Sequence, residues 1–253
     1  MSDVWLFFDI GDTLVNEDKL RFQIFKSLQK AITVETGHEF PFQELLALRE
    51  RRLLEGELGV HYGIAKELLS PAGYDAWVEG VATLIRNASQ SELHPIPAAV
   101  NILGQLSRYS LGIIADQPAH LLSQFANWGF EGVFSVVALD SLTGFHKPDT
   151  RLFEWALTRA NCRAANAVMV GNRLDADVIP AKRSGMKAIL CEIELSTKGW
   201  YPPGGDELLY LQSLSRVPNW RNNTAELSAG EQPDGFVTRL SELPGVVEKL
   251  LAE

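Results

Sequence analysis

Two aspartates lie at the end of the first hydrophobic run of the chain. Residues 4–15 read VWLFFDIGDTLV, and Asp9 and Asp12 interrupt this run where a buried strand is expected to end. A carboxylate at the end of a strand can be held by backbone amides and directed at a ligand. The positive charge and further acids that such a site requires must come from later parts of the sequence.

Two later segments supply candidate partners. Lys147 belongs to GFHKPD, residues 144–149, which precede an expected helix, and GNRLDAD, residues 171–177, follows an expected strand. Together these segments would place an acid, a lysine and an acid-rich turn along one edge of one sheet. A lysine in a loop is usually a solvated surface charge, so the elements that position Lys147 decide its role.

Short apolar runs alternate with helical patterns over most of the chain. This order favours an α/β fold with a doubly wound, Rossmann-like parallel sheet that is covered on both faces. The expected strands are residues 4–8, 111–115, 133–138, 167–170 and 188–191. Ligands bind at the carboxyl ends of the strands in such sheets, and polar turns follow all but the third of these strands. Residues 236–250 predict a final strand and helix.

The interval between the first two strands reads as helix throughout. Leu20, Ile24, Leu28 and Ile32 recur at helical spacing, and similar patterns continue beyond them. The interval is far longer than an ordinary strand-to-helix connection, which takes about 2 to 6 residues. We therefore expect an inserted α-helical cap domain over residues 16–93, and a core domain formed by residues 1–15 and 94–253.

The segment 195–234 combines turn formers with aromatic side chains. It contains WYPPGG at 200–205, PNW at 218–220 and NN at 222–223. This composition favours a mobile loop. The alternative is a flap or a subunit contact, because tryptophan and tyrosine concentrate at interface anchors. The sequence therefore leaves open whether the protein forms an oligomer through the cap or through this segment.

The overall composition argues against several classes of protein. Lysine and arginine number 23 against 32 acids, a formal net charge of -9, so we expect neither nucleic acid nor a membrane as a partner. Cys162 and Cys191 are far apart and lack a metal-ligand spacing, which excludes a disulfide scaffold and a zinc ribbon. The sequence shows neither a leader pattern nor an apolar run of about 18 residues, so we expect a cytoplasmic protein.

Four stretches of the chain resemble the haloacid dehalogenase (HAD) superfamily. They are FFDIGDTLV at 7–15, LGIIADQ at 111–117, GFHKPDTRLFEWAL at 144–157 and VMVGNRLDADVIPAKRSGM at 168–186. They occur in the order of the family, and the helical interval lies where the family commonly inserts an α-helical cap. The resemblance covers nearly the whole chain and implies a hydrolase with a HAD-like core.

The resemblance assigns chemistry to the first three motifs. In phosphatases of the family the first aspartate attacks phosphorus and forms an aspartyl-phosphate, and an aspartate two positions later protonates the leaving group. Asp9 would be this nucleophile, and Lys147 would neutralise the nucleophile and the transferred group. Gly11 stands at the acid position, and Ala115 stands where the family has a hydroxyl. Asp12 is a candidate replacement for the acid; otherwise it is an exposed turn residue.

A magnesium site is also implied by the resemblance. In this chain its ligands would be Asp9, the backbone carbonyl of Gly11, Asn172 and Asp177. Magnesium retains several waters and therefore needs few protein ligands. Asn172 stands where the family has a charged ligand, so we expect weakened metal binding.

Ala115, Asp116 and Arg173 are the candidate substrate-binding residues. Asp116 adds negative charge near the expected phosphate position. A phosphate dianion would therefore need a metal ion or a basic partner, for which Arg173 and Lys147 are the candidates. The substrate is expected to be a small phosphorylated molecule.

Three functions remain open at this point. The first is a phosphatase-like hydrolase of small phosphate esters with reduced or redirected activity. The second is a non-catalytic protein that uses the same fold to bind a ligand or a partner. The third is a 2-haloacid dehalogenase-like hydrolase, because those relatives use the first aspartate without the second acid and without metal. However, they usually carry an aromatic residue at the position of Gly11 and a hydroxyl at that of Ala115.

Overall fold

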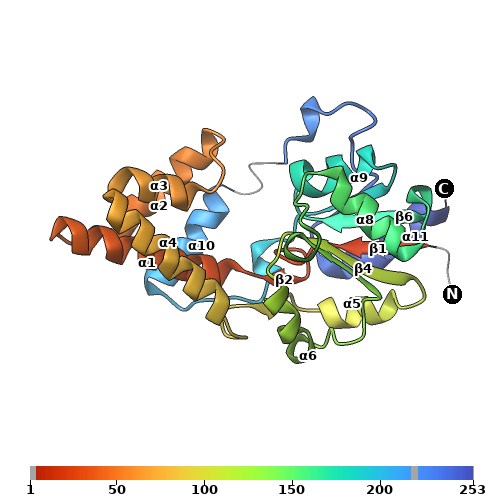
Figure 1. Cartoon of the computed structure of the whole chain (residues 1–253), viewed down its shortest axis with the longest axis horizontal. Helices are drawn as coiled ribbons and strands as arrows, with labels where there is room; N and C mark the ends of the chain where they lie inside the picture. Colours follow the sequence, from red (N-terminus) through yellow and green to blue (C-terminus); the bar gives the residue numbers. More distant parts are fainter. Residues whose placement is uncertain (1–3, 218–221, 253) are drawn as a thin grey trace. The chain divides into compact units, whose positions relative to one another are not determined.

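The computed structural model describes residues 4–217 and 222–252 (Figure 1), so the PNW turn at 218–220 lies outside the described residues. The chain divides into two compact units. One, the core unit, comprises Met1–Asn16, His94–Gly199 and Arg221–Glu253. The other, the helical unit, comprises Glu17–Leu93 and Trp200–Trp220.

A six-stranded sheet in the order β5-β4-β1-β6-β7-β8 forms the centre of the core unit. Its strands are Trp5–Phe8 (β1), Ser110–Ala115 (β4), Val136–Leu139 (β5), Ala167–Gly171 (β6), Lys187–Cys191 (β7) and Gly235–Val237 (β8). All neighbouring strands run parallel, which confirms the predicted α/β sheet. The strand expected over 133–138 begins only at Val136, because a turn closed by the Val133 amide and the Phe130 carbonyl precedes it.

Helices cover both faces of this sheet (Figure 1). On one face lie α8 (Thr150–Ala160) and α9 (Ile179–Arg183), and on the other lie α5 (Ala99–Gln105) and α11 (Leu243–Ala252). Successive residues of a strand point to opposite faces. Phe7 accordingly packs with Phe153 of α8, and the whole run 6–8 of β1 is buried. A strand that is buried on both faces explains why this run is continuously apolar.

Shorter elements complete the core unit. They are β2 (Val15–Asn16), β3 (His94–Pro95), α6 (Phe125–Trp128), α7 (Asp140–Thr143), the π-helix η3 (Leu174–Val178), and the 3-10 helices η1 (Ala119–Gln124), η2 (Ala164–Asn166), η4 (Leu195–Thr197), η5 (Thr224–Glu226) and η6 (Leu240–Glu242). β2 and β3 pair antiparallel. They therefore bring together the two points at which the chain leaves and re-enters the core unit around residues 17–93.

The helical unit contains α1 (Asp18–Thr36), α2 (Phe42–Leu54), α3 (Val60–Leu68), α4 (Pro71–Asn87) and α10 (Gly205–Arg216). The helices expected after the first strand are thus present, and Leu20, Ile24, Leu28 and Ile32 form the buried face of α1. Gly37 ends α1 in the left-handed conformation, and the Ser70 hydroxyl caps α4 by accepting a hydrogen bond from Gly73. In the part of the chain that is described, no helix has the length and hydropathy needed to cross a membrane.

The expectation of a mobile loop over residues 195–234 is wrong for its central part, which forms α10. The reason is the burial of Tyr210, whose ring lies 5.9 Å from that of Phe22 and 5.7 Å from that of Phe25. The Arg49 guanidinium covers the same ring at 5.6 Å. These contacts join α10 to α1 and α2, so the helical unit extends beyond the predicted range 16–93.

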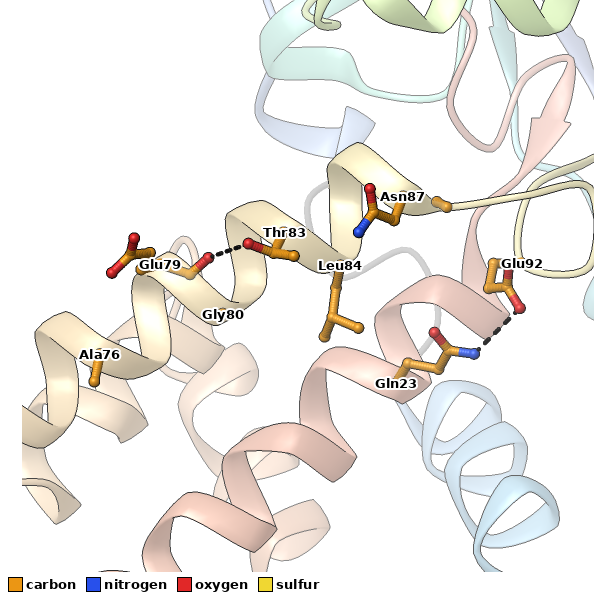
Figure 2. A pocket seen from close by; sticks show the side chains of 9 residues that line it. Gln23, Ala76, Glu79, Gly80, Thr83, Leu84, Asn87 and Glu92 are labelled. Atoms are coloured by element: carbon orange, nitrogen blue, oxygen red, sulfur yellow. Dashed lines mark hydrogen bonds between the residues drawn. The ribbon is translucent and has the colours of Figure 1, made fainter.

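A hollow of about 470 Å³ lies in the helical unit between α1 and α4 (Figure 2). It is lined by Gln23, Ala76, Glu79, Gly80, Thr83, Leu84, Asn87, Ala88 and Glu92. All the site residues proposed from the sequence belong to the core unit, so none of them lines this hollow. The candidate site residues therefore lie in the core unit, around its sheet.

A histidine of the helical unit gives a prediction about acid stability. Burial, assisted by the charge of Arg21, lowers the pKa of His61 to about 4, whereas an unfolded histidine titrates near pH ~6.5. The unfolded chain therefore binds the proton first, so the free energy of unfolding falls as the pH drops below about 6.5. Replacement of His61 by phenylalanine should reduce this loss by about 2 kcal/mol between pH ~7 and ~5, as measured by urea unfolding. The exposed His38→Phe variant is the control; an unchanged slope in His61→Phe would contradict the prediction.

Candidate active site

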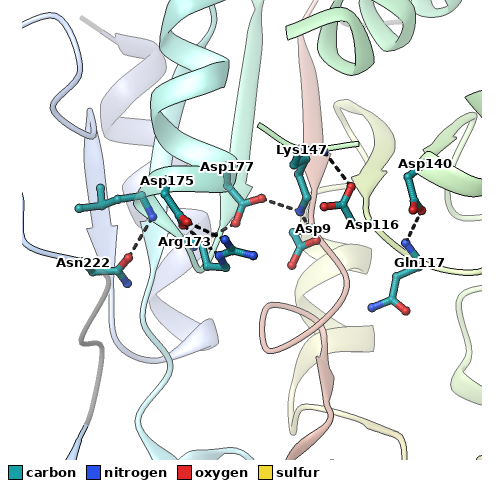
Figure 3. A network of polar contacts seen from close by, with 10 residues as sticks. Asp9, Asp116, Gln117, Asp140, Lys147, Arg173, Asp175, Asp177 and Asn222 are labelled. Atoms are coloured by element: carbon teal, nitrogen blue, oxygen red, sulfur yellow. Dashed lines mark hydrogen bonds and ion pairs between the residues drawn. The ribbon is translucent and has the colours of Figure 1, made fainter. Parts of the chain in front are cut away.

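One buried ammonium group joins two carboxylates at the carboxyl edge of the sheet (Figure 3). Lys147 Nζ donates to Asp9 Oδ1 at 2.6 Å and to Asp177 Oδ1 at 2.7 Å. The three side chains are 5%, 9% and 0% exposed, in the order Lys147, Asp9 and Asp177. Asp9 follows β1 and Asp177 follows β6, and these two strands are neighbours in the sheet. The structure thus brings together the three residues that the motifs share with the family.

Backbone contacts fix the positions of Asp9 and Lys147. The Asp9 amide donates to the Val170 carbonyl of the adjacent strand at 2.9 Å. The Lys147 amide donates to the Asp116 carboxylate at 2.9 Å, so Asp116 holds the loop that carries the lysine. Asp149 then caps α8 by accepting from the Arg151 amide at 2.9 Å. The lysine therefore lies in a short loop that is held at both ends.

The turn after β6 is shaped around Asp177. Asp177 Oδ2 accepts from the Arg173 amide at 3.0 Å, while the Arg173 side chain forms two hydrogen bonds, of 2.9 and 2.6 Å, with the Asp175 carboxylate. A side chain at Gly171 would lie 2.4 Å from Asp177 Cβ, so only glycine permits this close packing. The π-helix η3 contains Asp177, and such irregular turns are frequent at functional sites.

Asn222, which lies about 50 residues later in the sequence, forms hydrogen bonds with this turn (Figure 3). Its Oδ1 accepts from the Leu174 amide at 2.9 Å, and its Nδ2 donates to the Asn172 carbonyl at 2.9 Å and to Glu192 at 2.5 Å. The sequence analysis gave this residue no role in the site. No local pattern could have revealed it, because its partners at 172 and 174 are 50 and 48 residues away.

The electrostatic surroundings keep Lys147 charged. Burial alone would lower its pKa, but the charges of Asp177 and Asp9 and their hydrogen bonds outweigh this effect and raise it. Burial also raises the pKa of Asp116, which the hydrogen bond and charge of Lys147 partly oppose. At neutral pH Lys147 is therefore a fixed cation, which suits it to charge stabilisation rather than to proton transfer.

One of the remaining candidate residues differs from the sequence picture. The reading of Asp12 as an exposed turn residue is wrong, because Asp12 is only 9% exposed and its Oδ1 accepts from Lys198 Nζ at 2.9 Å. Ala115, the last residue of β4, is fully buried and carries no hydroxyl. Arg173 is engaged by Asp175, but its side chain keeps 36% exposure and lies beside the lysine site. Catalytic and binding roles for all these residues stay predictions.

Within residues 4–217 and 222–252, no three histidine, cysteine, aspartate or glutamate side chains are arranged as a metal-binding group. Asp9 and Asp177 nevertheless converge on one ammonium, and Asn172 and the Gly11 carbonyl belong to the adjoining turns. All four would offer hard oxygen donors. Magnesium is commonly bound by one or two carboxylates together with waters, so this donor set fits it.

Comparison with known proteins settles the family. Residues 6–191 match the family model described as haloacid dehalogenase-like hydrolase. The chain belongs to this family. It is therefore a hydrolytic enzyme with the α/β core of the family.

Several relatives of this haloacid dehalogenase-like hydrolase are phosphatases. The glyceraldehyde 3-phosphate phosphatase of Pyrococcus abyssi is 30% identical over 191 residues, which cover 73% of this chain and 79% of that protein. The enzyme of the same name from Methanothermobacter thermautotrophicus is 28% identical over 206 residues, 76% of this chain and 86% of that protein. A solved HAD phosphatase from Thermococcus onnurineus shares the fold, with a TM-score of 0.57 and 20% identity over 96% of this chain and 97% of that one.

The buried lysine gives a prediction about stability. Lys147→Met would leave Asp9 and Asp177 buried without their shared cation, which should lower the free energy of unfolding by about 3 kcal/mol. The double variant Lys147→Met/Asp177→Asn should recover part of this loss. Lys182→Met is a matched control, because Lys182 pairs with Asp234 in the same unit but is 16% exposed; we expect less than about 1 kcal/mol there. Urea unfolding measures all three, and a Lys147→Met protein as stable as the wild type would refute the prediction.

Proposed function

We propose that this enzyme is a magnesium-dependent phosphatase that hydrolyses a small phosphate ester through an aspartyl-phosphate on Asp9. The observation that carries the proposal is the single ammonium of Lys147, which binds Asp9 Oδ1 and Asp177 Oδ1. Phosphoryl transfer is catalysed largely by positioning and charge stabilisation, and this buried cation provides both beside the nucleophile. The relatives named glyceraldehyde 3-phosphate phosphatase make that compound the first substrate to test.

The proposed reaction has two displacements at phosphorus. The Asp9 carboxylate attacks the phosphorus atom, the bond from phosphorus to the ester oxygen breaks, and the leaving group departs as an alkoxide that takes a proton from solvent. Water then attacks the aspartyl-phosphate, releasing inorganic phosphate and restoring Asp9. Lys147 compensates the negative charge in both steps, and Arg173, at the edge of the site, is the candidate contact for the substrate.

The charges of the site support a role for a metal ion. Asp9, Asp116, Asp175 and Asp177 exceed the cations Lys147 and Arg173, so a phosphate dianion would be repelled without further positive charge. Magnesium, when bound, supplies this charge to the phosphoryl oxygens. Asp9, the Gly11 carbonyl, Asn172 and Asp177 are the residues that would hold it.

Gly11 gives the proposed phosphatase a reduced range of substrates. The residue at this position carries no side chain to protonate the leaving group, and general acid catalysis typically contributes about 10²- to 10⁴-fold. Esters with good leaving groups do not need this proton. The enzyme should therefore favour activated or acidic leaving groups over simple alcohols, which is the sense in which its activity is redirected.

The nucleophile assignment is tested by turnover. Wild-type protein with magnesium should release phosphate faster from p-nitrophenyl phosphate than from glyceraldehyde 3-phosphate, and Asp9→Asn should lower kcat by about 10⁴-fold or more. Glu248→Gln, an exposed carboxylate change on α11, is the control that should leave kcat unchanged. A folded wild-type protein that hydrolyses no member of a broad phosphate-ester panel would overturn the phosphatase assignment.

The metal assignment gives a separate prediction. Asn172→Asp would replace a neutral oxygen donor with a charged one, which should tighten magnesium binding about tenfold, or about 1.4 kcal/mol. Calorimetric titration with magnesium chloride measures this change directly. Chelation of the metal should abolish turnover of the wild-type protein, and restored magnesium should recover it. Equal magnesium affinity in Asn172→Asp and wild type would exclude residue 172 from the metal site.

A further inference from the structure

A second buried lysine lies at the turn that carries Asp9. Lys198 Nζ donates to Asp12 Oδ1 at 2.9 Å, across 186 residues of sequence. Lys198 and Asp12 are each 9% exposed. Lys198 follows η4, beyond the end of β7, and so reaches the β1 turn, residues 9–15, from a neighbouring part of the same unit. This ion pair connects the two segments close to the proposed nucleophile.

The backbone of Lys198 is itself held in place. Its carbonyl accepts from Asn16 Nδ2 at 3.0 Å, and Asn16 is fully buried. The next residue, Gly199, has a φ of 91°, and a side chain there would lie 2.9 Å from Pro97 Cγ. A lysine fixed in this way by its own backbone can present its ammonium at a defined place rather than follow its partner.

Asp12 occupies a backbone conformation that needs support. Its φ is 56°, in the left-handed region, where a residue other than glycine is disfavoured by about 1 kcal/mol. The Asp12 amide donates to the Val15 carbonyl at 2.7 Å, and the Leu14 and Val15 amides both donate to the Ile10 carbonyl at 2.9 Å. These bonds make the β1 turn a tight loop whose first residue is Asp9. The side chain of Asp12 is the point at which this loop is anchored to Lys198.

We propose that Lys198 is a positioning residue for hydrolysis: through Asp12 it holds the β1 turn so that the Asp9 carboxylate and the Gly11 carbonyl face the reacting phosphoryl group. The inference rests on the proposed function. It assigns Asp12 a structural partner instead of the role of the missing acid, since the Asp12 carboxylate serves as the counter-ion of Lys198. The ion pair with Lys198 also explains why Asp12 is tolerated at a left-handed backbone position that glycine would adopt without strain.

The test compares Lys198→Met, Lys198→Arg and Asp12→Asn with the wild type, and uses Lys182→Met as the matched control. A misplaced nucleophile loses rate with every substrate, so Lys198→Met should lower kcat about 10- to 10²-fold for both p-nitrophenyl phosphate and an alkyl phosphate, with KM changed less than about twofold. Lys198→Arg should recover most of this loss. Asp12→Asn should resemble Lys198→Met, and the double variant should be no worse than either single one, because the two residues act as one unit.

Two kinetic outcomes would overturn the proposal. Unchanged kcat in Lys198→Met, while Asp9→Asn is inactive, would remove Lys198 from the reaction but keep the phosphatase. A loss confined to the alkyl phosphate would make Lys198 the proton donor to the leaving group, because p-nitrophenolate leaves without a proton.

Hydrogen exchange tests the same idea without turnover. The amides of Asp12, Leu14 and Val15 should exchange at least about tenfold faster in Lys198→Met and Asp12→Asn than in wild type and in Lys182→Met. Unchanged exchange would refute the positioning role even if the protein proved to hydrolyse no phosphate ester. The failure of the proposal and the failure of the phosphatase assignment are therefore distinguishable.

Discussion

The site depends on the two ion pairs that the Lys147 ammonium forms with Asp9 and Asp177. β1 and β6 are neighbours, so their following residues Asp9 and Asp177 are brought together whether or not a counter-ion is present. Two buried carboxylates in one crevice repel each other strongly. A single cation between them offsets this repulsion, because it attracts both. The surrounding hydrogen bonds join side chains to backbone groups of the same loops. Asp116 accepts from the Lys147 amide, Asp177 accepts from the Arg173 amide, and Asn222 binds backbone groups of residues 172 and 174. They hold the charges at hydrogen-bonding distance from one another.

Chemical consequences follow from the imbalance of charge around this network. The site has more acids than bases, and Gly11 and Ala115, which the sequence analysis assigned to it, carry no polar side chain. In the proposed phosphatase Asp9 would attack phosphorus, and Lys147, which binds the Asp9 carboxylate, would supply the cation beside it. Such an enzyme would have few side chains to assist the leaving group, so its proposed specificity would depend strongly on the chemistry of the ester.

Sequence reasoning predicted the parts of the site that follow from strand ends. Asp9 and the turn around Asp177 come directly after buried strands, and the order of parallel strands places them at one edge. The pairs Asp12–Lys198 and Asn222–Leu174 could not be predicted, because each joins residues that are distant in sequence and have no periodic pattern. The helix α10 was missed for another reason. Prolines and glycines at 202–205 dominate the local signal, while the helix is stabilised by packing of Tyr210 against distant rings.

The position of α10 late in the sequence also has a consequence for folding during synthesis. Tyr210 completes a ring cluster with Phe22 and Phe25 of α1. At a synthesis rate of about 5 to 20 residues per second, the ribosome delivers this tyrosine about ten seconds or more after α1. The strands β4 to β7 are synthesised within that interval. The last contacts of the helical unit therefore form only after most strands of the core unit have been synthesised.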